Sequence, residues 1–258
     1  MVKKRHIRCF LFDLGSTLWT RYEEGTRQAK EAGYEQVGDL LRRARGGEIF
    51  AARDAREVGR EVHKAIGQQL RTEKHLRPEY EPDFARATRQ ALQLLGLAEA
   101  DLELGARVFE MLRVRIPVSR VLFPDTLSTL ETLRQRGYLL GVVTNRDYGG
   151  QPFREDLQSM GLLEYFEYHH MAISADLGVR KPNPDIFRYA LERLSARPEE
   201  TAMVGDNLLA DVGGARALNM LGIWKPKPAV HRKYHTTQSA KVVPDVTIDA
   251  LHDLLQIF

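Results

Sequence analysis

The chain has 258 residues, of which 43% are hydrophobic and 28% charged, and this is the composition of an ordinary globular protein. The length suits one large domain or a domain with an insertion. The formal net charge is only +3 with acidic residues interleaved among the basic ones, and no stretch approaches the ~20 apolar residues of a membrane span, so we expect neither a nucleic-acid nor a membrane partner.

The first predicted element is a buried strand over residues 7–12, a short apolar run that is followed at once by Asp13. The single cysteine of the chain, Cys9, lies in this run. A lone cysteine cannot form an internal disulfide, so we interpret it as strand core in a reducing compartment. The N-terminus is basic, but the apolar run after it is too short for a signal peptide. We therefore expect a cytoplasmic protein.

Residues 20–118 have a different composition, rich in Ala, Leu, Glu, Gln and Arg and nearly without β-branched runs. This composition favours helices. The pattern predicts four of them, over 20–44, 48–74, 83–95 and 99–114, with breaks at Gly46 and Gly47, from Pro78 to Pro82, and at Gly96. The segment therefore indicates a helical insertion after the first strand.

From about residue 120 onward, short apolar runs alternate with helical patterns. The runs predict strands over 139–144, 201–205 and 220–224; the patterns between them predict helices over 127–135, 152–160, 184–194 and 208–218. The polar stretch 225–241 is interpreted as a surface loop before a last short strand and helix within 246–257. Strands that alternate with helices predict an α/β fold with a doubly wound parallel sheet.

Polar residues follow the predicted strands at the points where ligands bind in parallel α/β sheets, beyond the carboxyl ends of the strands. Asp13 and Gly15 follow the first strand. The other members of this set are Thr144, Asn145, Lys181, Asp206 and Asp211. We expect these residues to converge at one edge of the sheet.

Three carboxylates in this set, Asp13, Asp206 and Asp211, offer the hard oxygen ligands that suit Mg²⁺. A bound Mg²⁺ attracts phosphate, whose other oxygens Thr144 and Lys181 could hold. Asp13 could then attack phosphorus and form an aspartyl-phosphate. The structural alternatives are a turn cap for Asp13 and a helix cap for Asp206.

Four segments carry a resemblance to a known family. They are Phe12-Asp13-Leu-Gly15-Ser-Thr17-Leu18, Val142-Val-Thr144-Asn145, Gly178-Val-Arg-Lys181-Pro182-Asn-Pro184-Asp-Ile-Phe187, and Val204-Gly205-Asp206-Asn207-Leu-Leu-Ala-Asp211-Val-Gly-Gly-Ala215. In this order the chain resembles the haloacid dehalogenase superfamily, in its phosphatase-like branch with a helical cap after the first strand. The resemblance implies a Rossmann-like core over 1–18 and 119–258 and a helical cap over 19–118 that closes over the site and selects the substrate.

The resemblance also implies a role for each site residue in the hydrolysis of a small phosphate monoester. Asp13 is the nucleophile, and Thr144 and Lys181 act in catalysis and hold the phosphoryl group. The Mg²⁺ ligands are Asp13, the backbone carbonyl of Gly15, Asp206 and Asp211. Independently of the resemblance, we expect Asn145 to bind substrate, because the free backbone N–H groups around it could hold a phosphate oxygen. Arg180, which lies in the third segment, is interpreted as a surface or salt-bridge residue.

Gly15 departs from the family pattern, because phosphatases of this family usually have a second Asp there that acts as general acid and base. Gly keeps the carbonyl and loses the acid, which contributes typically about 10²–10⁴-fold in rate. Three consequences remain open: another group substitutes, the leaving group needs no proton, or catalysis is impaired and the protein mainly binds. Because dehalogenases of this family also lack the second Asp, a metal-independent 2-haloacid dehalogenase is a further, less favoured alternative.

Overall fold

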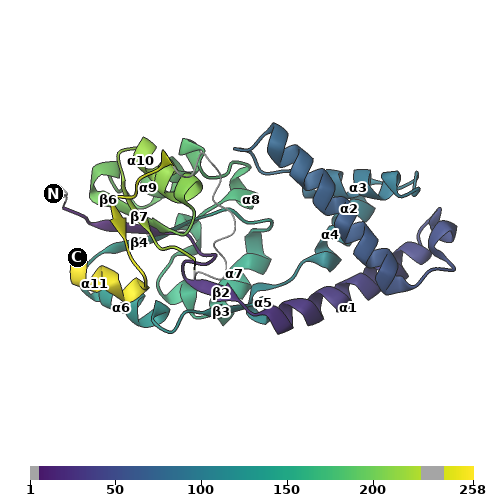
Figure 1. Cartoon of the computed structure of the whole chain (residues 1–258), viewed down its shortest axis with the longest axis horizontal. Helices are drawn as coiled ribbons and strands as arrows, with labels where there is room; N and C mark the ends of the chain where they lie inside the picture. The colour runs from purple at the N-terminus through teal and green to yellow at the C-terminus, as the bar shows by residue number, and fades with distance from the viewer. Residues whose placement is uncertain (1–5, 228–240) are drawn as a thin grey trace. The chain divides into compact units, whose positions relative to one another are not determined.

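The computed structural model of the chain describes residues 6–227 and 241–258, so most of the expected surface loop at 225–241 lies outside the described residues. The chain divides into two compact units (Figure 1). One is formed by Met1–Arg21 together with Val121–Phe258, and the other by Tyr22–Arg120. Within the described ranges, each helix is too short or too polar to cross a lipid bilayer.

The first unit contains a six-stranded sheet whose strands pair in parallel. In the order β5-β4-β1-β6-β7-β8 the strands are Ala172–Ile173, Leu139–Thr144, Cys9–Phe12, Thr201–Gly205, Leu221–Trp224 and Val246–Thr247. The first strand of the chain, β1, therefore lies between β4 and β6. In open parallel sheets of this kind, the crevice at such a reversal of strand order is the usual ligand site.

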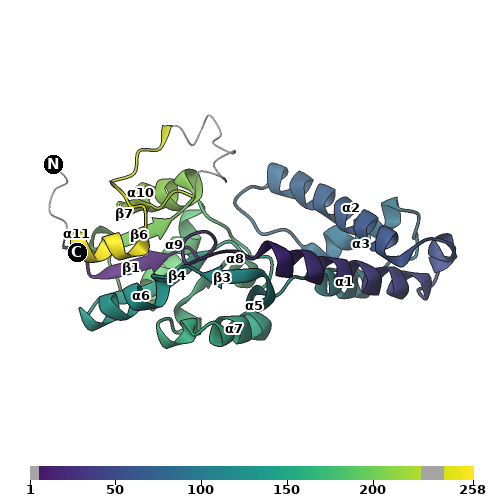
Figure 2. The ribbon, with the colours of Figure 1, turned by 60° about the horizontal axis from the view of Figure 1, so that its bottom comes forward.

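Helices cover both faces of this sheet (Figure 2). They are α6 (Thr126–Gln135), α7 (Gly150–Ser159), α8 (Ser174–Leu177), α9 (Pro184–Arg193), α10 (Gly214–Ala217) and α11 (Leu254–Ile257). Cys9 and Leu11 pack in one cluster with residues of α9. Phe10, which points to the other face because side chains alternate along a strand, packs against Phe258. The predicted α/β class with a Rossmann-like core is confirmed.

The second unit is helical. It contains α1 (Glu23–Arg42), a 3₁₀ turn (Gly47–Phe50), α2 (Ala55–Leu76), α3 (Phe84–Leu94), α4 (Leu102–Leu112) and the short α5 (Ile116–Ser119). Val37, Val58, Ala91 and Val108, one from each of the four long helices, are fully buried in a single cluster. The apolar faces of these amphipathic helices thus pack into a hydrophobic core within the helical unit.

Three segments differ from the sequence-based expectation. A two-stranded sheet of β2 (Trp19–Arg21) and β3 (Arg120–Leu122) stands where the first long helix was expected to begin. The expected helix at 48–74 is interrupted, because Asp54 accepts a hydrogen bond from the Glu57 N–H and caps a new helix there. The expected helix at 208–218 opens as a π-helix over Leu208–Gly213.

Helices α1 and α2 approach each other so closely that only glycine fits at the contact. A Cβ on Gly38 would lie 2.0 Å from the Ala55 carbonyl oxygen, and a Cβ on Gly59 would lie 2.0 Å from the Tyr34 carbonyl oxygen. We expect Gly38→Ala to lower the free energy of unfolding by about 1–3 kcal/mol, because the helices must move apart to admit the methyl group. Urea unfolding followed by circular dichroism measures this loss.

Gly67 in α2 provides the matched control. The nearest atom to a Cβ there is the end of the flexible Arg71 side chain, Nη1, at 3.4 Å. Gly67→Ala should therefore raise the free energy of unfolding by roughly 0.5–1 kcal/mol through helix propensity alone. Equal effects of the same sign at Gly38 and Gly67 would contradict the close-packing explanation.

Candidate active site

A pocket of about 260 Å³ opens in the first unit, at the carboxyl ends of the central strands. Its lining contains all seven residues that the sequence singles out: Asp13, Gly15, Thr144, Asn145, Lys181, Asp206 and Asp211. Arg146, Arg180, Asn207 and Ala210 complete the lining. Segments more than a hundred residues apart in sequence therefore meet around one cavity.

The strand register explains why these residues meet. Phe12, the last residue of β1, is level with Val142 of β4 and with Val204 of β6. The residues that come next along each strand are therefore also level. The Asp13 N–H continues the ladder by donating to the Val204 carbonyl oxygen at 2.9 Å. The same register brings Asp13 beside Val143, the residue before Thr144, and Thr144 Oγ1 donates to Asp13 Oδ1 at 3.4 Å.

Lys181 connects the carboxylates of Asp13 and Asp211. Its Nζ lies 2.7 Å from Asp13 Oδ1 and 2.7 Å from Asp211 Oδ1, and it donates to the Val143 carbonyl oxygen at 2.6 Å. Burial acts to lower the pKa of Lys181, but the charges of the two carboxylates outweigh it and raise the pKa. The side chain is therefore a buried ammonium held in one position.

Asn145 fixes the segment that carries this lysine. Its Oδ1 accepts from the Lys181 N–H at 2.8 Å, and its Nδ2 donates to the Lys181 carbonyl oxygen at 3.1 Å. The side-chain amide thus links the end of β4 to the loop before α9. The predicted contact between Asn145 and substrate stays a prediction, and in this arrangement the amide is engaged with protein backbone.

The three carboxylates Asp13, Asp206 and Asp211 form a cluster in which one oxygen from each lies within 4.8 Å of the others. Burial raises the pKa of Asp211 to about 7, with nearby Lys181 acting in the opposite direction. Burial and the charge of Asp13 also raise the pKa of Asp206. A set of hard oxygen donors whose negative charge is poorly solvated fits a small divalent cation such as Mg²⁺.

Local backbone contacts hold Asp211 in this cluster. The Asn207 N–H donates to Asp211 Oδ2 at 2.9 Å. Gly205 at the end of β6 allows the approach, because a Cβ there would lie 2.3 Å from the Asp211 carboxyl carbon. On the outer side of the cluster, Lys227 Nζ lies 2.9 Å from Asp206 Oδ2.

Gly15 leaves the pocket without a fourth carboxylate. A Cβ built on Gly15 would meet only Asp13 Oδ2, at 4.0 Å, so the position has room for a side chain. The hydroxyl of Thr17 lies on the other side of the same carboxylate from that of Thr144, and its Oγ1 donates to Asp13 Oδ2 at 3.5 Å. This hydroxyl is fully buried and orients the carboxylate.

Two arginines of the pocket lining are not among the seven site residues that the sequence predicts. Arg180, which the sequence analysis interprets as a surface or salt-bridge residue, and Arg146, to which it assigns no role, both line the pocket. Arg180 stands next to Lys181, and Arg146 follows Asn145 directly. The only sequence feature that could have predicted a pocket position for these arginines is their adjacency to motif residues, and adjacency does not determine which way a side chain points.

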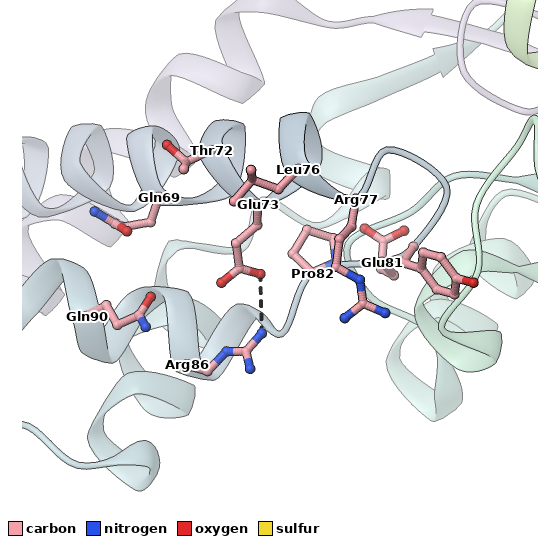
Figure 3. A pocket seen from close by; sticks show the side chains of 10 residues that line it. Gln69, Thr72, Glu73, Leu76, Arg77, Glu81, Pro82, Arg86 and Gln90 are labelled. Atoms are coloured by element: carbon pink, nitrogen blue, oxygen red, sulfur yellow. Dashed lines mark ion pairs between the residues drawn. The ribbon is translucent and has the colours of Figure 1, made fainter.

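A second pocket, of about 390 Å³, lies within the helical unit (Figure 3). It is lined by the last turns of α2, the segment after it and the first turns of α3, and Glu73 pairs with Arg86 across it at 3.6 Å. Arg77 lies over the ring of Tyr80, 4.6 Å from its centroid. None of the seven predicted site residues lines this pocket, and its two acids are matched by two arginines.

The chain belongs to the haloacid dehalogenase-like hydrolase family, which it matches over residues 7–219. It is 36% identical over 140 residues to a glyceraldehyde 3-phosphate phosphatase from Methanopyrus kandleri. The aligned residues cover 52% of this chain and 55% of that protein. It is 38% identical over 145 residues to a phosphoserine phosphatase from Thermus thermophilus. The aligned residues cover 55% of this chain and 54% of that protein. The chain thus spans about half the length of these curated relatives.

Solved structures with the same fold cover nearly the whole chain. A HAD phosphatase from Thermococcus onnurineus has a TM-score of 0.60 and 28% identity, with 97% of each chain covered. A 2-haloacid dehalogenase from Pseudomonas syringae has a TM-score of 0.66 and 23% identity, also with 97% of each chain covered. The second likeness shows the fold alone, and one fold can host different reactions.

Proposed function

We propose that the chain is a Mg²⁺-dependent phosphatase that hydrolyses a small phosphate monoester through an aspartyl-phosphate on Asp13. The observation that carries this proposal is the cluster of Asp13, Asp206 and Asp211 beside the pocket. A relative from Thermus thermophilus named phosphoserine phosphatase and one from Methanopyrus kandleri named glyceraldehyde 3-phosphate phosphatase support the same reaction class. Both named substrates are small phosphate monoesters.

In the proposed reaction, a carboxylate oxygen of Asp13 forms a bond to phosphorus while the bond to the alcohol oxygen breaks. Water then attacks phosphorus, releases phosphate and regenerates the carboxylate. Lys181 and Thr144 both donate to Asp13 Oδ1, so they fix the orientation of the carboxylate in the pocket. Mg²⁺, held by Asp13, Asp206, Asp211 and the Gly15 carbonyl, would neutralise charge on the phosphoryl oxygens.

A 2-haloacid dehalogenase is the second candidate, and the lack of a carboxylate at Gly15 is the observation that favours it. The carboxylate cluster argues against it, because displacement of a halide by Asp13 requires no cation. Hydrolysis of an aryl phosphate with and without Mg²⁺ separates the two reactions. Phosphate release that requires Mg²⁺ supports the phosphatase, whereas metal-independent halide release from a 2-haloacid, without phosphate release, would replace it.

Gly15→Asp tests what the missing acid costs. The new side chain has room, since a Cβ at Gly15 approaches only Asp13 Oδ2, at 4.0 Å. We expect Gly15→Asp to raise kcat for alkyl phosphates by about 10²-fold or more, because a poor leaving group needs a proton, and to change kcat for an aryl phosphate far less. Steady-state phosphate release measures both rates.

Gly15→Asn is the control, because the amide has nearly the shape of the carboxyl group and cannot transfer a proton in this way. It should leave kcat for alkyl phosphates near the wild-type value. If Gly15→Asn and Gly15→Asp raised kcat equally, the gain would come from packing rather than from acid–base catalysis.

A further inference from the structure

Arg146 lines the active-site pocket, and the proposed reaction leaves it without a role. Its backbone is fixed from both sides by Ser174, the first residue of α8. The Arg146 N–H donates to Ser174 Oγ at 2.8 Å, and Ser174 Oγ donates to the Arg146 carbonyl oxygen at 3.1 Å. Ser174 is fully buried, so the side chain of Arg146 starts from a rigid point.

Two aromatic rings hold the guanidinium group itself. Its Cζ lies 5.4 Å from the ring centroid of Tyr148 and 5.8 Å from that of Phe153. Tyr148 is itself tied down, because its hydroxyl donates to the buried carboxylate of Asp156. An arginine packed against aromatic rings keeps its charge and its in-plane N–H donors, so it is preorganised for an anion.

Across residues 6–227 and 241–258, no carboxylate forms an ion pair with Arg146, and its Nε is buried with no hydrogen-bond partner. Lys181 in the same pocket is the opposite case, with carboxylates at 2.7 Å on two sides. The protein therefore supplies no counter-charge to Arg146, and an anionic ligand in the adjoining pocket would supply one.

We propose that Arg146 binds a carboxylate of the substrate, so that the site selects phosphate monoesters that carry a carboxylate close to the phosphoryl group. This inference rests on the proposed phosphatase function. A spherical pocket of 260 Å³ is about 8 Å across, which spans a phosphoryl group at Asp13 and a carboxylate at Arg146 within one small molecule. The planar fork of a guanidinium matches a carboxylate with two parallel hydrogen bonds.

Two small phosphates that differ at one end test this selectivity. Phosphoglycolate carries a carboxylate, and 2-hydroxyethyl phosphate carries a neutral hydroxyl at the same place. For wild type, kcat/KM for phosphoglycolate should be about 10–100-fold higher than kcat/KM for 2-hydroxyethyl phosphate. Arg146→Gln should abolish this preference by lowering kcat/KM for phosphoglycolate alone, and Arg146→Lys should keep part of it, because charge remains without the fork.

The control is Arg188→Gln, which removes an exposed arginine that pairs with Asp185 outside the pocket. It should leave both kcat/KM values within about twofold of wild type. If Arg146→Gln lowered kcat/KM equally for both phosphates, Arg146 would be a packing residue and the inference would be overturned. A preference for ethane-1,2-diol bisphosphate over phosphoglycolate would overturn the assignment of a carboxylate.

Binding in the Asp13→Asn background separates this inference from the proposed function, because it needs no turnover. With Mg²⁺ present, phosphoglycolate should raise the Tm of Asp13→Asn more than 2-hydroxyethyl phosphate does, and adding Arg146→Gln should remove the difference. Equal shifts by the two ligands would overturn the role of Arg146 even if wild type hydrolyses phosphates. Unequal shifts that depend on Arg146, in a protein that hydrolyses no phosphate, would retain the anion site and reject the phosphatase.

Discussion

Asp13→Asn is expected to lower kcat for an aryl phosphate by on the order of 10³-fold or more, because the amide is a poor nucleophile toward phosphorus. The substitution hardly changes the size of the side chain, and the Asp13 N–H bond to the Val204 carbonyl oxygen is made by the backbone. The fold should therefore remain, as circular dichroism would verify. Phosphate release at saturating Mg²⁺ measures the loss.

Asp185→Asn is the matched control for this experiment. Asp185 lies in the first turn of α9, exposed and paired with Arg188 at 2.9 Å. Its substitution removes one carboxylate from the same unit and should leave kcat within about twofold of wild type. If Asp13→Asn kept a tenth or more of the wild-type rate, Asp13 would not be the nucleophile.

Lys181→Met is expected to lower the free energy of unfolding by about 3–5 kcal/mol and to abolish activity. The variant removes the ammonium that lies 2.7 Å from both Asp13 and Asp211, and thus leaves two buried carboxylates without their cation. For a chain of this size, the loss corresponds to a Tm lower by roughly 6–20 °C. Thermal unfolding in the presence of EDTA measures it.

The effect of Mg²⁺ on the Tm of Lys181→Met provides a second test of the role of Lys181. Because Mg²⁺ would supply the positive charge that the variant lacks, it should raise the Tm of Lys181→Met by more than it raises the Tm of wild type. Arg188→Met, which breaks an exposed ion pair, should cost less than about 1 kcal/mol and show no such Mg²⁺ effect. A Lys181→Met protein as stable as Arg188→Met would mean that the buried carboxylates need no compensation.

The sheet and the convergence of the site could be predicted from the sequence because both follow from strong, local patterns. Strands β4 and β6 are continuous apolar runs, and a parallel sheet places the residue after each run at the same edge. Asp13, Thr144 and Asp206 therefore meet without any knowledge of side-chain geometry. The chemical roles of these residues, and the role of residues 19–118 as a cap, stay predictions.

The missed features depend on tertiary contacts that no short pattern records. Strand β2 has three residues and owes its conformation to its pairing with β3, which lies about a hundred residues away in sequence. Arg146 faces the pocket because the rings of Tyr148 and Phe153 hold its guanidinium. The position of Arg146 next to Asn145 in the sequence does not predict these ring contacts. Side-chain direction at a strand end is set by packing, so the sequence could name the site without naming its whole lining.

Transfer of the phosphoryl group to Asp13 is tested most directly by peptide mass spectrometry of acid-quenched protein. Wild type mixed with an aryl phosphate and Mg²⁺, then quenched in acid, should carry a phosphoryl group on the peptide that contains Asp13. The label should be absent without Mg²⁺ and absent in Asp13→Asn. Phosphate release by wild type with no label on that peptide, or with the label on another residue, would contradict the proposed mechanism.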